Sequence, residues 1–331
     1  MAGRRQKKSG GRSYAWRYRG RIVACVFVEV IIICALVIMI GWNKGVKEWF
    51  EQFEQPVLKE VDISGINSPN AILMQDRGGK ILGEINGEAQ IYPASMTKIM
   101  TVILGIENFD NLDEKITLTD EMFAGLYEQD ATQAGFQPGE EVRVIDLLYG
   151  AMLPSGAECC IALADTISGS EADFAELMNK KARKLGMENT HFCDSTGLHN
   201  PDHYSTVKDI AVLMKYCIKN DTFREIVETS RHSTGVTNIH PDGITYYSTM
   251  FKNLSDPTVT GGKILGGKTG YTSEAGHCLV SFAEIEGREY IFVSAGASGA
   301  DGNTIPHIQD AVTVYNRVGA AIEEKMNDNN K

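Results

Sequence analysis

The longest apolar stretch of the chain lies near its amino end. Residues 22–40 contain only one charged side chain, Glu29. A helix of this length crosses the hydrocarbon core of a bilayer. Residues 1–21 hold eight Lys or Arg and no acid, and basic residues before a span keep that end in the cytoplasm. We therefore expect a basic cytoplasmic tail at 1–21 and a single-pass transmembrane signal anchor at 22–41 in the cell membrane, with the rest extracytoplasmic.

Two other interpretations of the amino end are weaker. A cleaved signal peptide needs a small-x-small site, which residues 41–44 (Gly-Trp-Asn-Lys) do not provide. A basic arm that binds nucleic acid would not be expected to adjoin an apolar run. Residues 1–41 carry eight of the 32 basic and one of the 43 acidic residues, so the remainder has a net charge of −18. This acidic surface also argues against a nucleic-acid partner.

The pattern beyond residue 62 changes from strand to helix and back. Apolar runs bounded by turn signals predict strands at 71–75 and 80–85, with a turn at 76–79. From residue 95 to about 229 the period is mainly helical; the clearest segments are 144–149, 159–167, 171–185 and 207–218. Strands return at 263–267, 278–285 and 290–297, and a last helix covers 305–325. This order predicts an α+β body at 63–325 with an inserted helical lobe, preceded by a polar stalk at 42–62.

One helix in this pattern carries a candidate nucleophile. Residues 93–105 begin with Pro and continue almost entirely apolar, which predicts a buried helix with its start near Ser95. Ser95 and Lys98 are three residues apart, so the Lys98 amine can reach the Ser95 hydroxyl. A serine hydroxyl needs a neighbouring base to become a good nucleophile, and a desolvated lysine can be that base.

The same Ser-x-x-Lys spacing occurs a second time, at 205–208. There it has a structural explanation, because Ser205 or Thr206 is well placed to cap the helix that follows. The spacing alone is therefore weak, and Ser95 must be judged by its companions.

Metal and nucleotide sites are not expected. Five cysteines follow residue 41, and no two have the spacing of zinc ligands; we expect mostly free, buried thiols. His199 and His203 are separated by Pro201, which argues against a helical pair of metal ligands. Residues 262–269 satisfy the spacing of a phosphate-binding P-loop, but that loop needs a helix directly after it, and here a strand follows. We expect no cofactor.

Three short segments together resemble one group of serine enzymes. Ser-x-x-Lys at 95–98 is followed by Ser-Gly-Ala at 155–157 and by Lys-Thr-Gly at 268–270, an order that resembles the penicillin-recognising enzymes. Residues 189–206 (containing Asn-Thr-His-Phe, Thr-Gly-Leu and Asp-His-Tyr-Ser-Thr) are closest to the low-molecular-mass D-alanyl-D-alanine carboxypeptidases, peptidase family S11. The likeness covers about 63–320. It implies a β-lactamase/transpeptidase-like fold, with an antiparallel sheet and flanking helices.

The resemblance also implies roles for particular residues. Ser95 would attack the carbonyl between the two terminal D-alanines of a peptidoglycan stem peptide, with Lys98 as general base and Ser155 as proton relay. The substrate-binding residues would be Lys268, Thr269, Gly270 and Tyr271. The backbone N–H groups of Ser95 and Tyr271 would form the oxyanion hole. β-Lactams would acylate Ser95 as covalent inhibitors.

Two features depart from the family's pattern. Position 157 is Ala where the family usually has Asn, and residues 296–306 lack the arginine with which many relatives hold the substrate's carboxylate. Two alternatives therefore stay open: a serine β-lactamase-like hydrolase, and a catalytically weak protein that binds muropeptides or β-lactams. The sequence has no clear Glu-x-x-x-Asn loop, which argues against the β-lactamase-like hydrolase. Retention of Lys98 and Lys268 argues against the catalytically weak binding protein.

Overall fold

The computed structural model describes residues 58–254, 256–299 and 305–329. The chain divides into two units at residues 56 and 57, and all the described residues belong to the second. The expected tail and anchor at 1–41, and the stalk as far as residue 57, lie outside the described residues. Within the described ranges, no helix has both the length and the apolar character that a membrane span requires.

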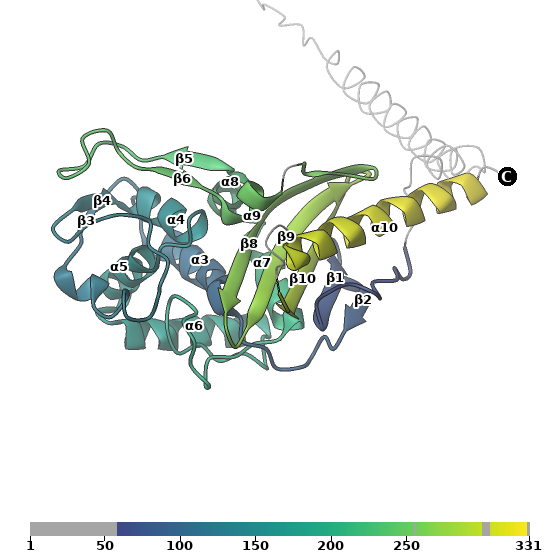
Figure 1. Cartoon of the computed structure of the whole chain (residues 1–331), viewed down its shortest axis with the longest axis horizontal. Coiled ribbons are helices and arrows are strands. Elements are labelled where there is room, and N and C mark those ends of the chain that lie inside the picture. Colours follow the sequence, from purple (N-terminus) through teal and green to yellow (C-terminus); the bar gives the residue numbers. More distant parts are fainter. Residues whose placement is uncertain (1–57, 255, 300–304, 330–331) are drawn as a thin grey trace, which may run out of the picture. The chain divides into compact units, whose positions relative to one another are not determined.

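A six-stranded sheet lies at the centre of this unit, in the order β2-β1-β10-β9-β8-β7 (Figure 1). Every pairing is antiparallel. The strands are β1 (Asn70–Gln75), β2 (Lys80–Ile85), β7 (Thr258–Val259), β8 (Gly262–Thr272), β9 (Gly276–Ile285) and β10 (Arg288–Ala297). The predicted strands are confirmed, although β8 continues five residues beyond its predicted end at 267.

The helices between β2 and β7 form the inserted lobe (Figure 1). They are η1 (Ala94–Thr97), α3 (Lys98–Asn108), η2 (Asp120–Phe123), α4 (Val144–Met152), α5 (Ala157–Ser168), α6 (Glu171–Leu185), α7 (Val207–Cys217), α8 (Asp221–Glu228) and α9 (Thr249–Asn253). Two small antiparallel pairs were not predicted: β3 (Lys115–Thr117) with β4 (Glu141–Arg143), and β5 (Arg231–Ser233) with β6 (Thr245–Tyr247). Strands of three residues are too short to establish a period of two.

The two faces of the sheet bury separate cores, because side chains alternate along each strand. In β1, Ile72 and Met74 pack with the helical lobe. Ala71 and Leu73 pack on the opposite face with the last helix, α10 (Pro306–Asn329), which crosses the sheet in yellow in Figure 1. Leu58 and Val61 join this second core, so residues 58–62, expected in the stalk, belong to the folded body.

Asp310 fastens α10 to the segment before β1. Its carboxylate is buried and accepts hydrogen bonds from the backbone N–H groups of Asn67 and Ser68 and from both of their side chains, at 2.6–2.9 Å. Removal of the carboxylate would leave buried donors without an acceptor, which is the costly way to lose a hydrogen bond.

We predict that Asp310→Ala lowers the free energy of unfolding by about 3 kcal/mol, measured by urea denaturation. Glu323→Ala, at an exposed position of the same helix, is the control and should change stability by less than about 0.5 kcal/mol. Equal effects of the two substitutions would contradict this role of Asp310.

Candidate active site

Ser95 and Lys98 meet at the junction of η1 and α3. Pro93 precedes η1, and the helix that follows is buried along most of its length. Lys98 itself is 3% exposed. Its Nζ donates to Ser95 Oγ at 3.1 Å and to the carbonyl oxygen of Thr196 at 2.6 Å. The structure thus places a lysine amine directly behind the hydroxyl, as the spacing predicted.

The second Ser-x-x-Lys is structural, as expected. Thr206 caps α7, where its side chain accepts from the backbone N–H of Asp209 at 3.0 Å. The Lys208 amine pairs with Glu88 at the surface, and Ser205 exchanges a hydrogen bond with Thr190. Serine and lysine do not meet there, so the two copies of the motif differ in geometry.

Ser155 and Lys268 form a second serine–lysine pair across the site. Ser155 lies in the turn between α4 and α5, with a left-handed backbone (φ 72°) that is costly for a residue with a side chain. Lys268, on β8, is 1% exposed and donates to Ser155 Oγ at 3.0 Å and to the carbonyl of Thr269 at 2.9 Å. Backbone strain of this kind gathers at functional sites.

Burial dominates the electrostatics of Lys268. Desolvation, and then the nearby positive charge of Lys98, bring the pKa of Lys268 well below its ordinary value of 10.5. Burial and a neighbouring positive charge both disfavour an ammonium group relative to the neutral amine. Both causes therefore shift Lys268 toward its neutral form.

Strand β8 brings the other predicted residues alongside Ser95. A Cβ on Gly270 would lie 3.0 Å from the backbone nitrogen of Ser95, so only glycine allows this approach without displacement. The Thr269 hydroxyl shares a hydrogen bond with Thr249 at 2.7 Å. Tyr271 is exposed and packs against His277 on β9, with ring centroids 4.6 Å apart.

These residues surround a cavity of about 930 Å³. Ser95 and Ser155 contribute to its wall from the helical lobe, and residues 269–274 contribute from β8 and the turn after it. The lining also includes Thr249, which no sequence signal pointed to, and three histidines, His199, His277 and His307. The structure thus brings all seven predicted site residues to one place, with Lys98 and Lys268 behind the two serines.

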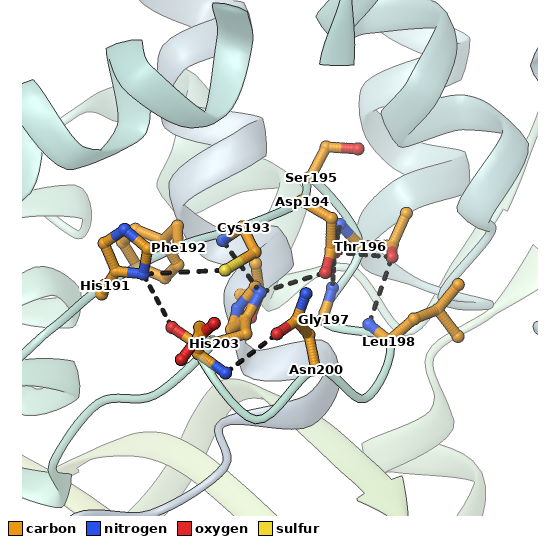
Figure 2. Close-up of polar contacts among 12 residues, drawn as sticks. His191, Phe192, Cys193, Asp194, Ser195, Thr196, Gly197, Leu198, Asn200 and His203 are labelled. Atoms are coloured by element: carbon orange, nitrogen blue, oxygen red, sulfur yellow. Dashed lines mark hydrogen bonds and ion pairs between the residues drawn. The ribbon is translucent and has the colours of Figure 1, made fainter. Parts of the chain in front are cut away.

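The loop between α6 and α7 contains Thr196 (Figure 2), whose carbonyl oxygen accepts the hydrogen bond from Lys98. Asp194 accepts from the backbone N–H groups of Thr196 and Gly197 at 2.7 and 2.6 Å and from the Thr196 hydroxyl at 2.8 Å. A Cβ on Gly197, whose φ is 82°, would lie 1.9 Å from the carbonyl oxygen of Ala94. Because Gly197 has no side chain, the loop packs directly against η1. This contact and the hydrogen bonds to Asp194 hold the carbonyl of Thr196 in position.

His203 links this loop back to the start of the helix that carries Lys98. Its Nδ1 lies 3.0 Å from Asp194 Oδ2 and its Nε2 lies 2.9 Å from the Thr97 hydroxyl. Burial by itself would raise the pKa of Asp194, but the hydrogen bond and charge of His203 and the donors of Thr196 and Gly197 outweigh it and lower that pKa to about 2. No pattern in the sequence indicated the link of Asp194 and His203 to Lys98.

The structure also bears on the other sequence expectations. Residues 262–269, which match the P-loop spacing, all lie within strand β8. Cys159, Cys160, Cys217 and Cys278 are buried, Cys193 is partly buried, and all five are free. In the part of the chain that the structure describes, no three His, Cys, Asp or Glu side chains are grouped to hold a metal ion.

Comparison with known proteins identifies the family. The sequence profile of peptidase family S11, described as D-alanyl-D-alanine carboxypeptidase, matches residues 57–299. The chain belongs to this family. It is 35% identical over 233 residues to the D-alanyl-D-alanine carboxypeptidase DacF of Bacillus subtilis, a match that covers 69% of this chain and 57% of DacF. The chain therefore spans just over half the length of that relative.

Two further comparisons come from Streptomyces K15. The D-alanyl-D-alanine carboxypeptidase of that strain is 35% identical over 236 residues, covering 69% of this chain and 78% of the relative. The crystal structure of the Streptomyces K15 DD-transpeptidase superimposes with a TM-score of 0.69 at 29% identity, over 79% of this chain and all of that one. The curled antiparallel sheet with helices is thus the transpeptidase/carboxypeptidase fold of S11 enzymes.

The low pKa of Asp194 gives a testable dependence of stability on pH. The folded pKa of about 2 lies below the ordinary 3.8, so the ionised carboxylate stabilises the fold by about 2 kcal/mol above pH 4 and loses this contribution as the pH falls toward 2. We predict that the free energy of unfolding of the wild type, measured by urea denaturation, exceeds that of Asp194→Asn by about this amount at pH 7 and pH 5. The difference should be smaller at pH 3. A constant difference would contradict the assignment.

Proposed function

We propose that this chain is a serine D,D-carboxypeptidase that removes the terminal D-alanine from peptidoglycan stem pentapeptides. The observation that carries the proposal is the contact of the buried Lys98 amine with the Ser95 hydroxyl, 3.1 Å apart in the wall of a large cavity. The fold and family of the chain support this choice over an unrelated serine hydrolase.

In the first step, Ser95 Oγ attacks the carbonyl carbon between the two terminal D-alanines while Lys98 accepts the hydroxyl proton. Backbone N–H groups of Ser95 and Tyr271 stabilise the oxyanion, and loss of one such donor typically costs about 3 kcal/mol. The carbon–nitrogen bond then breaks, and the Ser155 hydroxyl passes a proton to the leaving amine of D-alanine. Water hydrolyses the acyl-enzyme and restores the Ser95 hydroxyl.

Lys268 supports the leaving-group step. Its hydrogen bond to Ser155 Oγ positions the relay hydroxyl, which passes the proton that Lys98 took from Ser95 on to the leaving amine. β-Lactams acylate Ser95 by the same attack, because their strained amide occupies the place of the peptide bond.

A second candidate reaction uses the same acyl-enzyme. The Streptomyces K15 structure, 29% identical to this chain, bears the name DD-transpeptidase. An amine of a second stem peptide could replace water as acceptor, which would cross-link two stems rather than trim one. Product analysis with and without an added amino acceptor distinguishes the two reactions.

We also propose that residues 22–41 anchor the chain in the cell membrane, with residues 1–21 cytoplasmic and residues from 63 onward extracytoplasmic. The apolar run and the eight basic residues before it support this topology. A reporter fused after residue 331 that is active only outside the cytoplasm should be active and should remain with the membrane fraction. A reporter released in soluble form would instead indicate cleavage.

We predict that Lys98→Met lowers kcat/KM for D-alanine release from a stem pentapeptide by at least about 10²-fold, because the general base is lost. Lys208→Met makes the same chemical change in the second Ser-x-x-Lys and should leave kcat/KM unchanged. D-Alanine is measured with D-amino-acid oxidase. Full activity of the Lys98 variant would contradict the mechanism, and absence of D-alanine release from the wild type would contradict the function.

A further inference from the structure

Three histidines that have no part in the mechanism above lie in the cavity wall, and two of them, His277 and His307, stack on each other. His277 is near the start of β9, and His307 is in the first turn of α10. Their rings are stacked, with centroids 5.0 Å apart and planes 6° from parallel. Tyr271 also contacts His277, with the ring planes tilted by 36°. All three side chains line the cavity that contains Ser95.

Neither imidazole has a hydrogen-bond partner among the described residues. His307 is 3% exposed, and its buried Nδ1 has no partner. Buried polar atoms are nearly always paired, so an exception beside a cavity calls for an explanation. Five other histidines are described, and each has a polar or ionic partner: His191, His199, His203, His232 and His240.

The charges around the cavity are otherwise unsuited to an anion. The lining contains two carboxylates, Asp130 and Glu274, and His199 lies 3.8 Å from Glu274. Lys98 and Lys268 are not in the lining, and their amines donate to the two serines and to backbone carbonyls. Among the described lining residues, His277 and His307 are therefore the basic side chains without an acidic partner.

The positions of the two histidines fit one end of a peptide substrate. Gly270 lies against Ser95, Tyr271 is the next residue, and His277 is directly opposite Tyr271 in the neighbouring strand. One Cα step is about 3.8 Å and a cross-strand pair is about 5 Å apart. In a substrate with a terminal D-alanine, the carboxylate carbon lies about 4 Å from the attacked carbonyl carbon. An imidazole from β9 is within reach of that carboxylate.

We infer that His277 and His307 bind the free carboxylate of the substrate's terminal residue, together with the hydroxyls of Thr249 and Thr269. This inference rests on the proposed function and names the group that selects a free carboxyl terminus. Burial lowers the pKa of His277, and burial with the neighbouring His277 lowers the pKa of His307 to about 4. A bound carboxylate favours the protonated form and gives the pair its missing partner.

The test compares diacetyl-L-Lys-D-Ala-D-Ala with its C-terminal amide, using the full-length chain. The wild type is expected to prefer the acid by about 10- to 100-fold in kcat/KM, as for a charge-assisted hydrogen bond. His277→Gln and His307→Gln should each lower that preference by about 10-fold, mainly through KM for the acid. His191→Gln, the same change at an exposed residue outside the cavity, should retain it, and His277→Arg should preserve it.

Binding measurements separate this inference from the proposed function. Calorimetry of the two peptides with Ser95→Ala, alone and combined with His277→Gln or His307→Gln, needs no turnover. Loss of the preference for the acid on removal of either histidine supports the inference even if the wild type proves inactive. Equal affinity of Ser95→Ala for acid and amide, or equal weakening of both peptides in the histidine variants of unchanged Tm, would overturn it.

Discussion

The burial of the Lys98 amine between the Ser95 hydroxyl and the Thr196 carbonyl is the constraint on which the site depends. A buried ammonium without partners would be strongly unfavourable, and both of these oxygens come from segments held by other parts of the fold. Thr196 is fixed by Asp194, whose carboxylate is in turn held by His203. Ser95 is held by η1 against β8, where Gly270 leaves room for it. The Lys98 amine thus lies where the helical lobe packs against the sheet.

The second lysine gives this arrangement its chemistry. Lys268 is as deeply buried as Lys98 and lies close enough for the two charges to oppose each other. Each amine donates a hydrogen bond to one serine, Lys98 to Ser95 and Lys268 to Ser155, and the proposed proton transfers run through these two hydroxyls. Ala157, where the family usually has Asn, is the first residue of α5 and is buried. Lys98 uses the Thr196 carbonyl as its second acceptor.

The sequence predicted those parts of the molecule that have strong local signals. The strands, the long helices and the helical lobe follow from apolar periodicity, and the Ser95–Lys98 contact follows from helical spacing. The capping residues correctly marked the second Ser-x-x-Lys as structural. The pairs β3–β4 and β5–β6 were missed because strands of three residues carry no period. Thr249, His277 and His307 could not be assigned to the cavity, because tertiary packing of distant segments places them there.

Intact mass of the full-length chain after exposure to benzylpenicillin tests the acyl-enzyme account most directly. The account predicts one covalent adduct equal to the mass of the whole β-lactam, located on Ser95 by peptide mapping and absent from Ser95→Ala. It also predicts that Ser205→Ala, in the second Ser-x-x-Lys, still acquires the adduct. No adduct on a folded wild-type chain, or an adduct that survives in Ser95→Ala, would contradict the assignment of Ser95 as the nucleophile.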